Sequence, residues 1–175
     1  MNIDIVYARN VDHPFPVLAW LIMIFQKMNP FGEKSFNHMA IRYRKQNGEV
    51  WYFDATGKHG VKHRRDFDFL KTYKIIEVDR LFIPANVVSF GNFIGAHNGK
   101  KYDKLNVFGL MLKNMLNFVT FNTLGHNQRK IVCSELVVLL LVEFCKVKVK
   151  DSDNWDLNDT RRLVKRRVHG NISAT

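Results

Sequence analysis

Apolar and polar residues alternate in two neighbouring stretches of the chain, and this pattern predicts half-buried β-strands. The stretches cover about 36–44 and 49–54, and the residues between them, Lys-Gln-Asn-Gly, have the composition of a hairpin turn. Residues 4–8 and 73–83 are rich in apolar and β-branched residues and predict further strands. Together these stretches predict a small antiparallel sheet.

Longer apolar stretches predict helices that pack against this sheet. The segment from Lys130 to Val142 is strongly apolar, with Cys133 near its beginning. Further helices are expected at about 17–28, 86–97 and 104–121, and a short basic helix is expected after a polar loop at about 151–158. Neither a repeat nor a low-complexity linker interrupts the chain. We therefore expect a single α+β domain over residues 1–175, with the helices grouped against a small antiparallel sheet.

The composition is that of a folded globular protein whose cysteines stay reduced. Of the 175 residues, 46% are hydrophobic and 13% are aromatic, which is enough to build a core without disulfides or metals. Cys133 and Cys145 are the only cysteines. If both lie on one helix, they are separated by about 18 Å along its axis, far beyond disulfide reach. Cys133 is therefore expected to be a free thiol, and Cys145 a free packing residue.

The first residues of the chain lack the basic and apolar regions of a signal peptide. The apolar run at 17–25 is far shorter than the roughly 20 residues needed to span a bilayer. We expect a cytoplasmic or otherwise reducing location without a transmembrane segment. The run at 17–25 is interpreted as a buried helix, with a helix resting on a lipid surface as the alternative.

The formal net charge of +11 and the isoelectric point near 9.8 make acidic partners plausible. Basic residues gather at 63–65 and again near the C-terminus, where the cluster consists of Arg161, Arg162, Lys165, Arg166 and Arg167. One interpretation of such clusters is a solvated helix face. The other is attraction to an anionic partner such as a membrane surface, a cell-wall polymer or nucleic acid.

Three residues supply the chemistry of a thiol hydrolase. Cys133 stands at the start of an apolar helix, where backbone N–H groups favour a thiolate. His38 lies at the beginning of one predicted strand, and Asp54 ends the next. A nucleophile needs a base, and the base needs a group that fixes its tautomer and orientation. Each residue also has a structural interpretation: Cys133 as a buried thiol, His38 as a core histidine and Asp54 as a turn residue.

The motifs around these residues resemble those of the circularly permuted NlpC-type papain-like hydrolases, which are related in fold to the lecithin:retinol acyltransferase group. The matching segments are His38-Met-Ala-Ile41, Asp54-Ala55 followed by Gly60-Val61, Gly99-Lys-Lys-Tyr-Asp103 and, as the sharpest of them, Cys133-Ser-Glu-Leu-Val137. Two positions depart from the family pattern, because Ala40 replaces a common glycine and Asp54 replaces a more frequent Glu. The resemblance implies a papain-like fold with the nucleophile at the start of a late helix, and Cys133, His38 and Asp54 as its catalytic residues.

The expected function is that of a cysteine hydrolase, either an amidase or peptidase or an acyl-ester or thioester hydrolase, with acyl transfer as a further possibility. Its substrate is expected to be a peptide or an acyl-lipid, and the sequence does not choose between them. The alternative is a non-catalytic basic module that binds nucleic acid or an anionic membrane. The seven histidines show no metal-ligand spacing, and no glycine-rich phosphate loop is present. We therefore expect neither a metal nor a cofactor.

Overall fold

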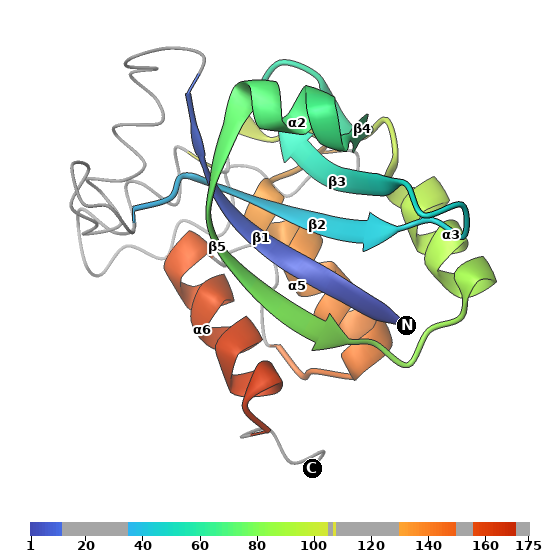
Figure 1. Ribbon diagram of the computed structural model, residues 1–175. Helices are drawn as coiled ribbons and strands as arrows, with labels where there is room; N and C mark the ends of the chain where they lie inside the picture. Colours follow the sequence, from blue (N-terminus) through green and yellow to red (C-terminus); the bar gives the residue numbers. More distant parts are fainter. Residues whose placement is uncertain (12–34, 105–106, 108–129, 150–155, 171–175) are drawn as a thin grey trace, which may run out of the picture.

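The computed structural model describes residues 1–11, 35–104, 107, 130–149 and 156–170 (Figure 1). The helix expected at 17–28, most of the helix expected at 104–121 and most of the loop expected at 151–158 lie outside these residues. Within the described part of the chain, no helix is both long enough and apolar enough to cross a membrane.

Five antiparallel strands form one sheet in the order β4-β3-β2-β1-β5 (Figure 1). The strands are β1 (Asn2–Asn10), β2 (His38–Arg44), β3 (Val50–Thr56), β4 (Gly60–Arg65) and β5 (Tyr73–Phe82). The hairpin predicted at 36–54 is confirmed as β2 and β3, and its turn contains Gly48 with φ of +86°. The strands predicted at 4–8 and 73–83 are confirmed as β1 and β5.

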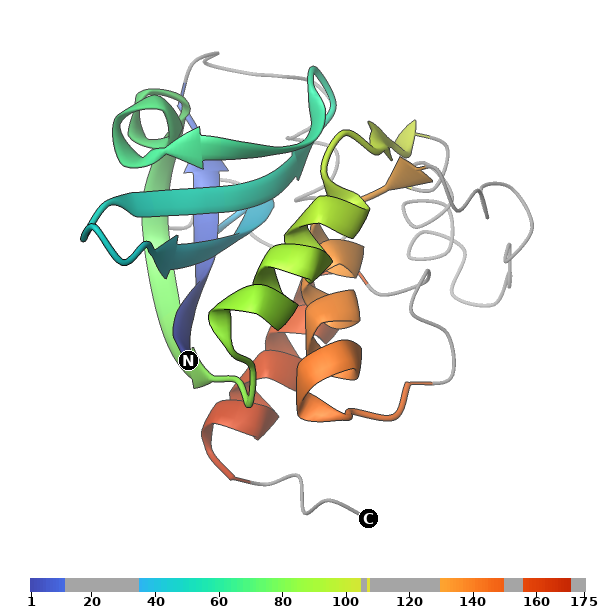
Figure 2. The same cartoon turned by 90° about the vertical axis from the view of Figure 1, so that its right-hand side faces the viewer.

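Among the described residues, three helices cover one face of this sheet, and a fourth short helix lies on the opposite face (Figure 2). The covering helices are α3 (Val87–His97), α5 (Cys133–Cys145) and α6 (Leu157–Val168), and the opposite one is α2 (Asp66–Thr72). A separate pair of short parallel strands, β6 (Lys101–Tyr102) and β7 (Lys130–Ile131), lies beside β4. The predicted α+β arrangement of helices against an antiparallel sheet is confirmed.

The alternation of side chains along each strand divides the interior into two cores. In β1, Ile3, Ile5 and Tyr7 point toward the three covering helices and join the larger core, which includes most of the buried residues of α5. Val6 and Ala8 point the other way, into a smaller core under α2. The apolar face of α5 is thus held against the sheet, and this fixes where the helix begins.

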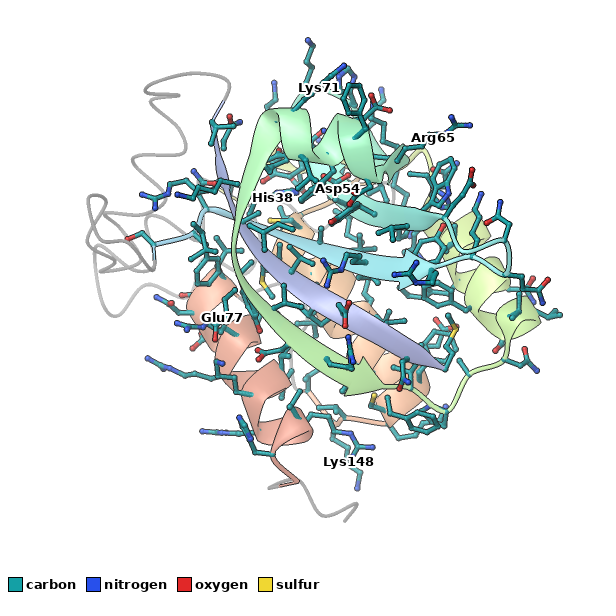
Figure 3. All side chains as sticks on the ribbon, viewed as in Figure 1. His38, Asp54, Arg65, Lys71, Glu77 and Lys148 are labelled. Carbon is teal, nitrogen blue, oxygen red and sulfur yellow. The ribbon has the colours of Figure 1, made fainter. Side chains whose placement is uncertain are left out.

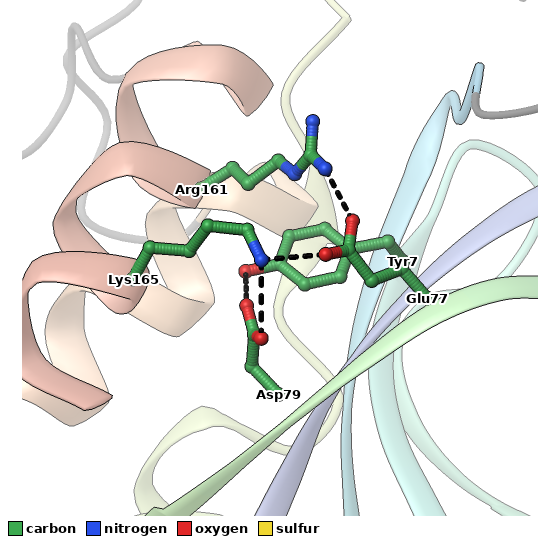
Figure 4. A network of polar contacts seen from close by, with 5 residues as sticks. All are labelled: Tyr7, Glu77, Asp79, Arg161 and Lys165. Carbon is green, nitrogen blue, oxygen red and sulfur yellow. Dashed lines mark hydrogen bonds and ion pairs between the residues drawn. The ribbon is translucent and has the colours of Figure 1, made fainter. Parts of the chain in front are cut away.

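Polar contacts dock α6 on the edge strand β5 (Figure 4). Glu77 accepts hydrogen bonds from Arg161 and from Lys165, and the distance from its Oε1 to Lys165 Nζ is 2.5 Å. Lys165 also reaches Asp79, which accepts a 2.9 Å hydrogen bond from the hydroxyl of Tyr7. Two members of the C-terminal basic cluster therefore face the sheet and are paired within the chain.

The strand β4 and the helix α2 have no clear signal in the sequence and were not predicted. Residues 63–65, His-Arg-Arg, were interpreted only as a charge cluster, although they form the end of β4 and lead into α2. An edge strand needs only one paired side and tolerates charged residues, so its hydrophobic pattern is weak. The helix α2 buries only Phe69 and is too short to show a helical period.

We predict that Glu77→Gln lowers the free energy of unfolding by about 1 kcal/mol at neutral pH, because two partly buried cations lose their carboxylate partner. Partial burial works to raise the pKa of Glu77, but Lys165 and Arg161 outweigh it and lower this pKa. The contribution of Glu77 is therefore present above its unfolded-state pKa and is lost as the pH falls through the lowered pKa. Denaturant unfolding of both proteins at pH 7 and pH 3 measures this difference.

The exposed Glu143 of α5 provides the control for this prediction. Glu143→Gln removes the same charge without touching the α6 contact, and it should change stability by less than about 0.5 kcal/mol. Equal effects of the two substitutions would show that the contact between Glu77 and α6 adds nothing beyond net charge.

Candidate active site

His38 and Asp54 form a buried hydrogen bond between neighbouring strands (Figure 3). Ala40 of β2 pairs with Asp54 of β3, so His38 lies two residues further along the same face and diagonally opposite the carboxylate. The distance from His38 Nε2 to Asp54 Oδ2 is 2.8 Å, and Asp54 has no exposed surface. The shorter side chain of Asp, compared with the Glu of the resembled family, reaches the imidazole in this register.

Cys133 is the first residue of α5, as the sequence analysis expected for the nucleophile position. The first backbone hydrogen bond of this helix runs from the N–H of Leu136 to the carbonyl of Val132. The N–H groups of Cys133 and Ser134 therefore precede the helical ladder and lie at the positive end of the helix dipole. Glu135 accepts a 3.3 Å hydrogen bond from the N–H of Val132 and so helps to cap the start of the helix.

The structure brings Cys133 to the imidazole of His38. Its thiol lies close enough to be one of the groups that raise the pKa of the imidazole. Because Nε2 is engaged with Asp54, Nδ1 is the ring nitrogen left for the sulfur. Residues separated by 95 positions in the sequence thus meet at the end of the sheet where α5 begins.

The pKa of His38 is raised well above its usual value near 6.5. Burial favours the neutral ring and works against this shift, but the interactions with Tyr73, Asp54 and Cys133 outweigh it. The buried site therefore favours an imidazolium between a carboxylate and a sulfur. An imidazolium at this position can stabilise a negative charge on the neighbouring sulfur.

Aromatic rings fix the plane of the imidazole. Tyr73 stacks on His38 with a centroid distance of 4.3 Å and an interplanar angle of 11°. Phe69 of α2 packs against Tyr73 at 4.9 Å, and Tyr52 stacks on the other side of Phe69 at 3.9 Å. The short helix that the sequence did not reveal therefore helps to hold the histidine ring.

Arg64 also belongs to the site, although in the sequence it stands out only as a member of the charge cluster at 63–65. The distance from its Nε to Asp54 Oδ1 is 3.2 Å, and its side chain is only 9% exposed. The two atoms form an ion pair, but the angle is too poor for a hydrogen bond. Its position on the same face as Asp54, two strands from His38, depends on β4.

Tyr102 of β6 is a second residue of the site that was not predicted from the sequence. Its hydroxyl lies near Cys133, and burial together with the nearby sulfur raises the pKa of Tyr102 well above the usual value of 10. Tyr102 pairs with Ile131 across β6 and β7, and Ile131 precedes the cysteine by two residues. The motif Gly99-Lys-Lys-Tyr-Asp103 was noted in the sequence, but no role was assigned to its tyrosine.

Two of the segments that resemble the family, Gly60-Val61 and Gly99-Lys-Lys-Tyr-Asp103, are joined by backbone hydrogen bonds. The N–H of Val61 donates to the carbonyl of Lys100, and the N–H of Gly99 donates to the carbonyl of Val61. Gly60 has φ of +70°, and a Cβ there would lie 2.3 Å from the Lys100 carbonyl oxygen. Glycine at 60 therefore allows the backbone before Tyr102 to pack closely against β4.

The C-terminal basic cluster is divided by the fold. Arg161 and Lys165 pair with Glu77, and Arg167 lies close enough to Cys145 to act on the pKa of its thiol. Arg162 and Arg166 are exposed, although Arg162 also lies 3.5 Å from Asp159. Binding of an anionic partner through this cluster stays a prediction, and the exposed pair is where such a partner would bind.

The histidines of the described residues do not gather into a metal site. No group of three or more His, Cys, Asp or Glu side chains in these ranges is arranged to hold a metal ion. Both cysteines are free thiols, and Cys145 is half-buried against the core, as predicted.

We predict that Gly60→Ala destabilises the fold by more than 2 kcal/mol and slows alkylation of Cys133. Both effects follow because the new methyl group displaces the Lys100 carbonyl and, with it, Tyr102. Gly48→Ala is the matched control, since Gly48 also has a positive φ but a Cβ there meets no described atom within 4 Å. The control should cost about 1–2 kcal/mol and leave the thiol unaffected. Equal effects in both variants would contradict this account of Gly60.

We also predict that Asp54→Asn lowers the pKa of His38, because the amide removes the negative charge that stabilises the imidazolium. Nitrogen-15 NMR of the imidazole rings measures the titration directly. Asp68→Asn, at an exposed position of α2, provides the control and should leave the pKa unchanged. An unchanged pKa in Asp54→Asn would assign the shift to Tyr73 and Cys133 instead.

No protein-family model matches the chain, and no curated protein is similar to it at a significant level. The case for a function therefore depends on the side chains gathered around Cys133, His38 and Asp54.

Proposed function

We propose that this protein is a cysteine hydrolase that cleaves an amide, ester or thioester through a covalent acyl-enzyme. The observation that carries the proposal is the position of His38, which has a buried carboxylate on one ring nitrogen and the Cys133 thiol beside the other. This is the connectivity that an activated nucleophile requires.

In the first half of the proposed reaction, the proton of the Cys133 thiol is already held by His38 as an imidazolium, and the thiolate attacks the carbonyl carbon of the substrate. The tetrahedral intermediate then collapses as His38 gives its proton to the leaving amine, alcohol or thiol. In the second half, His38 takes a proton from water, the hydroxide attacks the thioester, and Cys133 leaves. An acceptor other than water would give acyl transfer.

Asp54 and Arg64 act through the histidine in this mechanism. Asp54 holds His38 with Nε2–H toward the carboxylate, so that Nδ1 faces the sulfur. Arg64 pairs with the second carboxylate oxygen and keeps the buried carboxylate from being left with a single cation. Both are positioning residues.

Two groups are available to stabilise the negative charge that develops on the carbonyl oxygen. One is the N–H of Cys133 at the start of α5, and the other is the Tyr102 hydroxyl. The high pKa of Tyr102 keeps this hydroxyl protonated at neutral pH, as a hydrogen-bond donor must be.

The order of the motifs supports a relation to the permuted papain-like hydrolases. His38 and Asp54 come from early strands, while the nucleophile comes from a late helix, and this is the order in the resembled family. The five-stranded antiparallel sheet with α5 packed on β2 and β3 is compatible with that fold. The permuted papain-like fold is thus part of the proposal.

The proposal is tested by incubating the protein with panels of activated peptide, acyl-lipid and thioester substrates and locating the acyl adduct by mass spectrometry. We expect an adduct on Cys133 in the wild-type protein and in Cys145→Ala, but none in Cys133→Ala. Tyr102→Phe should lower the acylation rate about 100-fold, because it removes one oxyanion donor.

Thiol reactivity separates the enzyme from a non-catalytic basic module. In an enzyme, Cys133 should react with iodoacetamide much faster than Cys145, and His38→Ala should remove this difference. Equal and slow reaction of both thiols, with no adduct from any substrate panel, would contradict the proposal and favour the binding module.

A further inference from the structure

A basic pocket lies beside the proposed active site, next to Asp54. It has a volume of about 320 Å³, and its wall includes Thr56, Lys58, His59, Arg64 and Tyr73. The turn between β3 and β4 supplies the exposed residues Lys58 and His59. The hydroxyl oxygen of Thr56 accepts a 3.2 Å hydrogen bond from the N–H of His59 and so closes this turn.

Two residues of this pocket also belong to the proposed site. Tyr73 stacks on His38, and Arg64 pairs with Asp54. The guanidinium carbon of Arg64 lies 5.7 Å from the centre of the Tyr73 ring, so the two side chains form one continuous wall. Tyr73 therefore connects the pocket with the imidazole of His38, which would activate the nucleophile.

The pocket is lined by basic side chains, of which Lys58 is exposed at its mouth. Lys58, His59 and Arg64 line it, and its described lining includes neither Asp nor Glu. Asp54 is the nearest buried carboxylate in the described residues, and it is shared between His38 and Arg64. The pKa of His59 is lowered by desolvation and by the nearby cations Lys62, Lys58 and Arg64.

A concave site lined by basic side chains attracts carboxylate or phosphate groups. We propose that this pocket binds an anionic group, a carboxylate or a phosphate, carried by the acyl substrate. The inference rests on the proposed function and narrows its substrates to acyl compounds with a negative charge outside the scissile bond. Arg64 then has two roles, since it fixes Asp54 and forms the inner wall of the anion pocket.

The test compares nitrophenyl esters that differ only in the charge of the far end: adipate with a free carboxylate, its neutral amide adipamate, and 5-phosphonopentanoate. The second-order rate constant for acylation of Cys133 should be higher for the anionic esters. Lys58→Glu should lower the ratio of anionic to neutral rate constants about tenfold and leave the neutral ester unaffected. Added KCl should lower the same ratio by screening.

Lys148→Glu is the matched control, because Lys148 is exposed at the opposite end of the molecule (Figure 3). It changes the net charge equally and should leave the ratio unchanged. Comparison of the adipate and phosphonate esters identifies which anion the pocket prefers. Equal rates for charged and neutral esters in the wild-type protein, or equal losses in Lys58→Glu and Lys148→Glu, would overturn the inference.

A binding experiment distinguishes failure of this inference from failure of the proposed function. Inorganic phosphate is titrated at constant ionic strength while NMR follows the ring of His59, and the shift should be saturable in the wild-type protein and absent in Lys58→Glu. If Cys133 is acylated equally by charged and neutral esters, the proposed hydrolase function is supported and the proposed anion pocket is contradicted. Phosphate binding without acylation by any ester would contradict the hydrolase and overturn the pocket as a substrate subsite.

Discussion

The hydrogen bond between His38 and Asp54 is the contact on which the proposed site depends. It forms only in the observed register of β2 and β3, because a shift by one residue would send one of the two side chains to the opposite face of the sheet. The large core under α3, α5 and α6 fixes that register from the other face. The burial of ordinary apolar residues thus determines the geometry of two polar ones.

The surroundings of this hydrogen bond make a buried charge tolerable. A carboxylate without exposed surface is costly unless it is paired, and Asp54 has cations on both oxygens. The imidazole is enclosed by Tyr73, which continues through Phe69 to Tyr52 as a stack of rings. Burial by itself favours the neutral imidazole, and the interactions with Tyr73, Asp54 and Cys133 raise the pKa of His38 in spite of it.

The basic residues of this chain have different structural roles, and these roles cannot be told apart from the net charge alone. Arg161 and Lys165 hold α6 on the sheet through Glu77, whereas Arg64 supports the carboxylate of the proposed site. Lys58 and His59 are exposed at the pocket beside it. The excess of positive charge is therefore partly structural and partly local to the site, and a purely electrostatic interpretation of the composition would miss this division.

The sequence by itself determined the strands at 4–8, 36–54 and 73–83, the helix at 86–97 and the helix that begins at Cys133. Each of these has a clear period of burial or a boundary signal, such as the Asn86 cap of α3, and such signals are local. The sequence also pointed to Cys133, His38 and Asp54 as candidates, through residue chemistry and a family resemblance. The tertiary structure alone decided that Arg64 and Tyr102 join them. Arg64 lies on the edge strand β4, whose charged residues obscure the apolar–polar alternation that predicts a strand. Tyr102 reaches the sulfur only because β6 pairs with β7. Such pairings between distant segments are set by packing of the whole domain, and no local pattern encodes them.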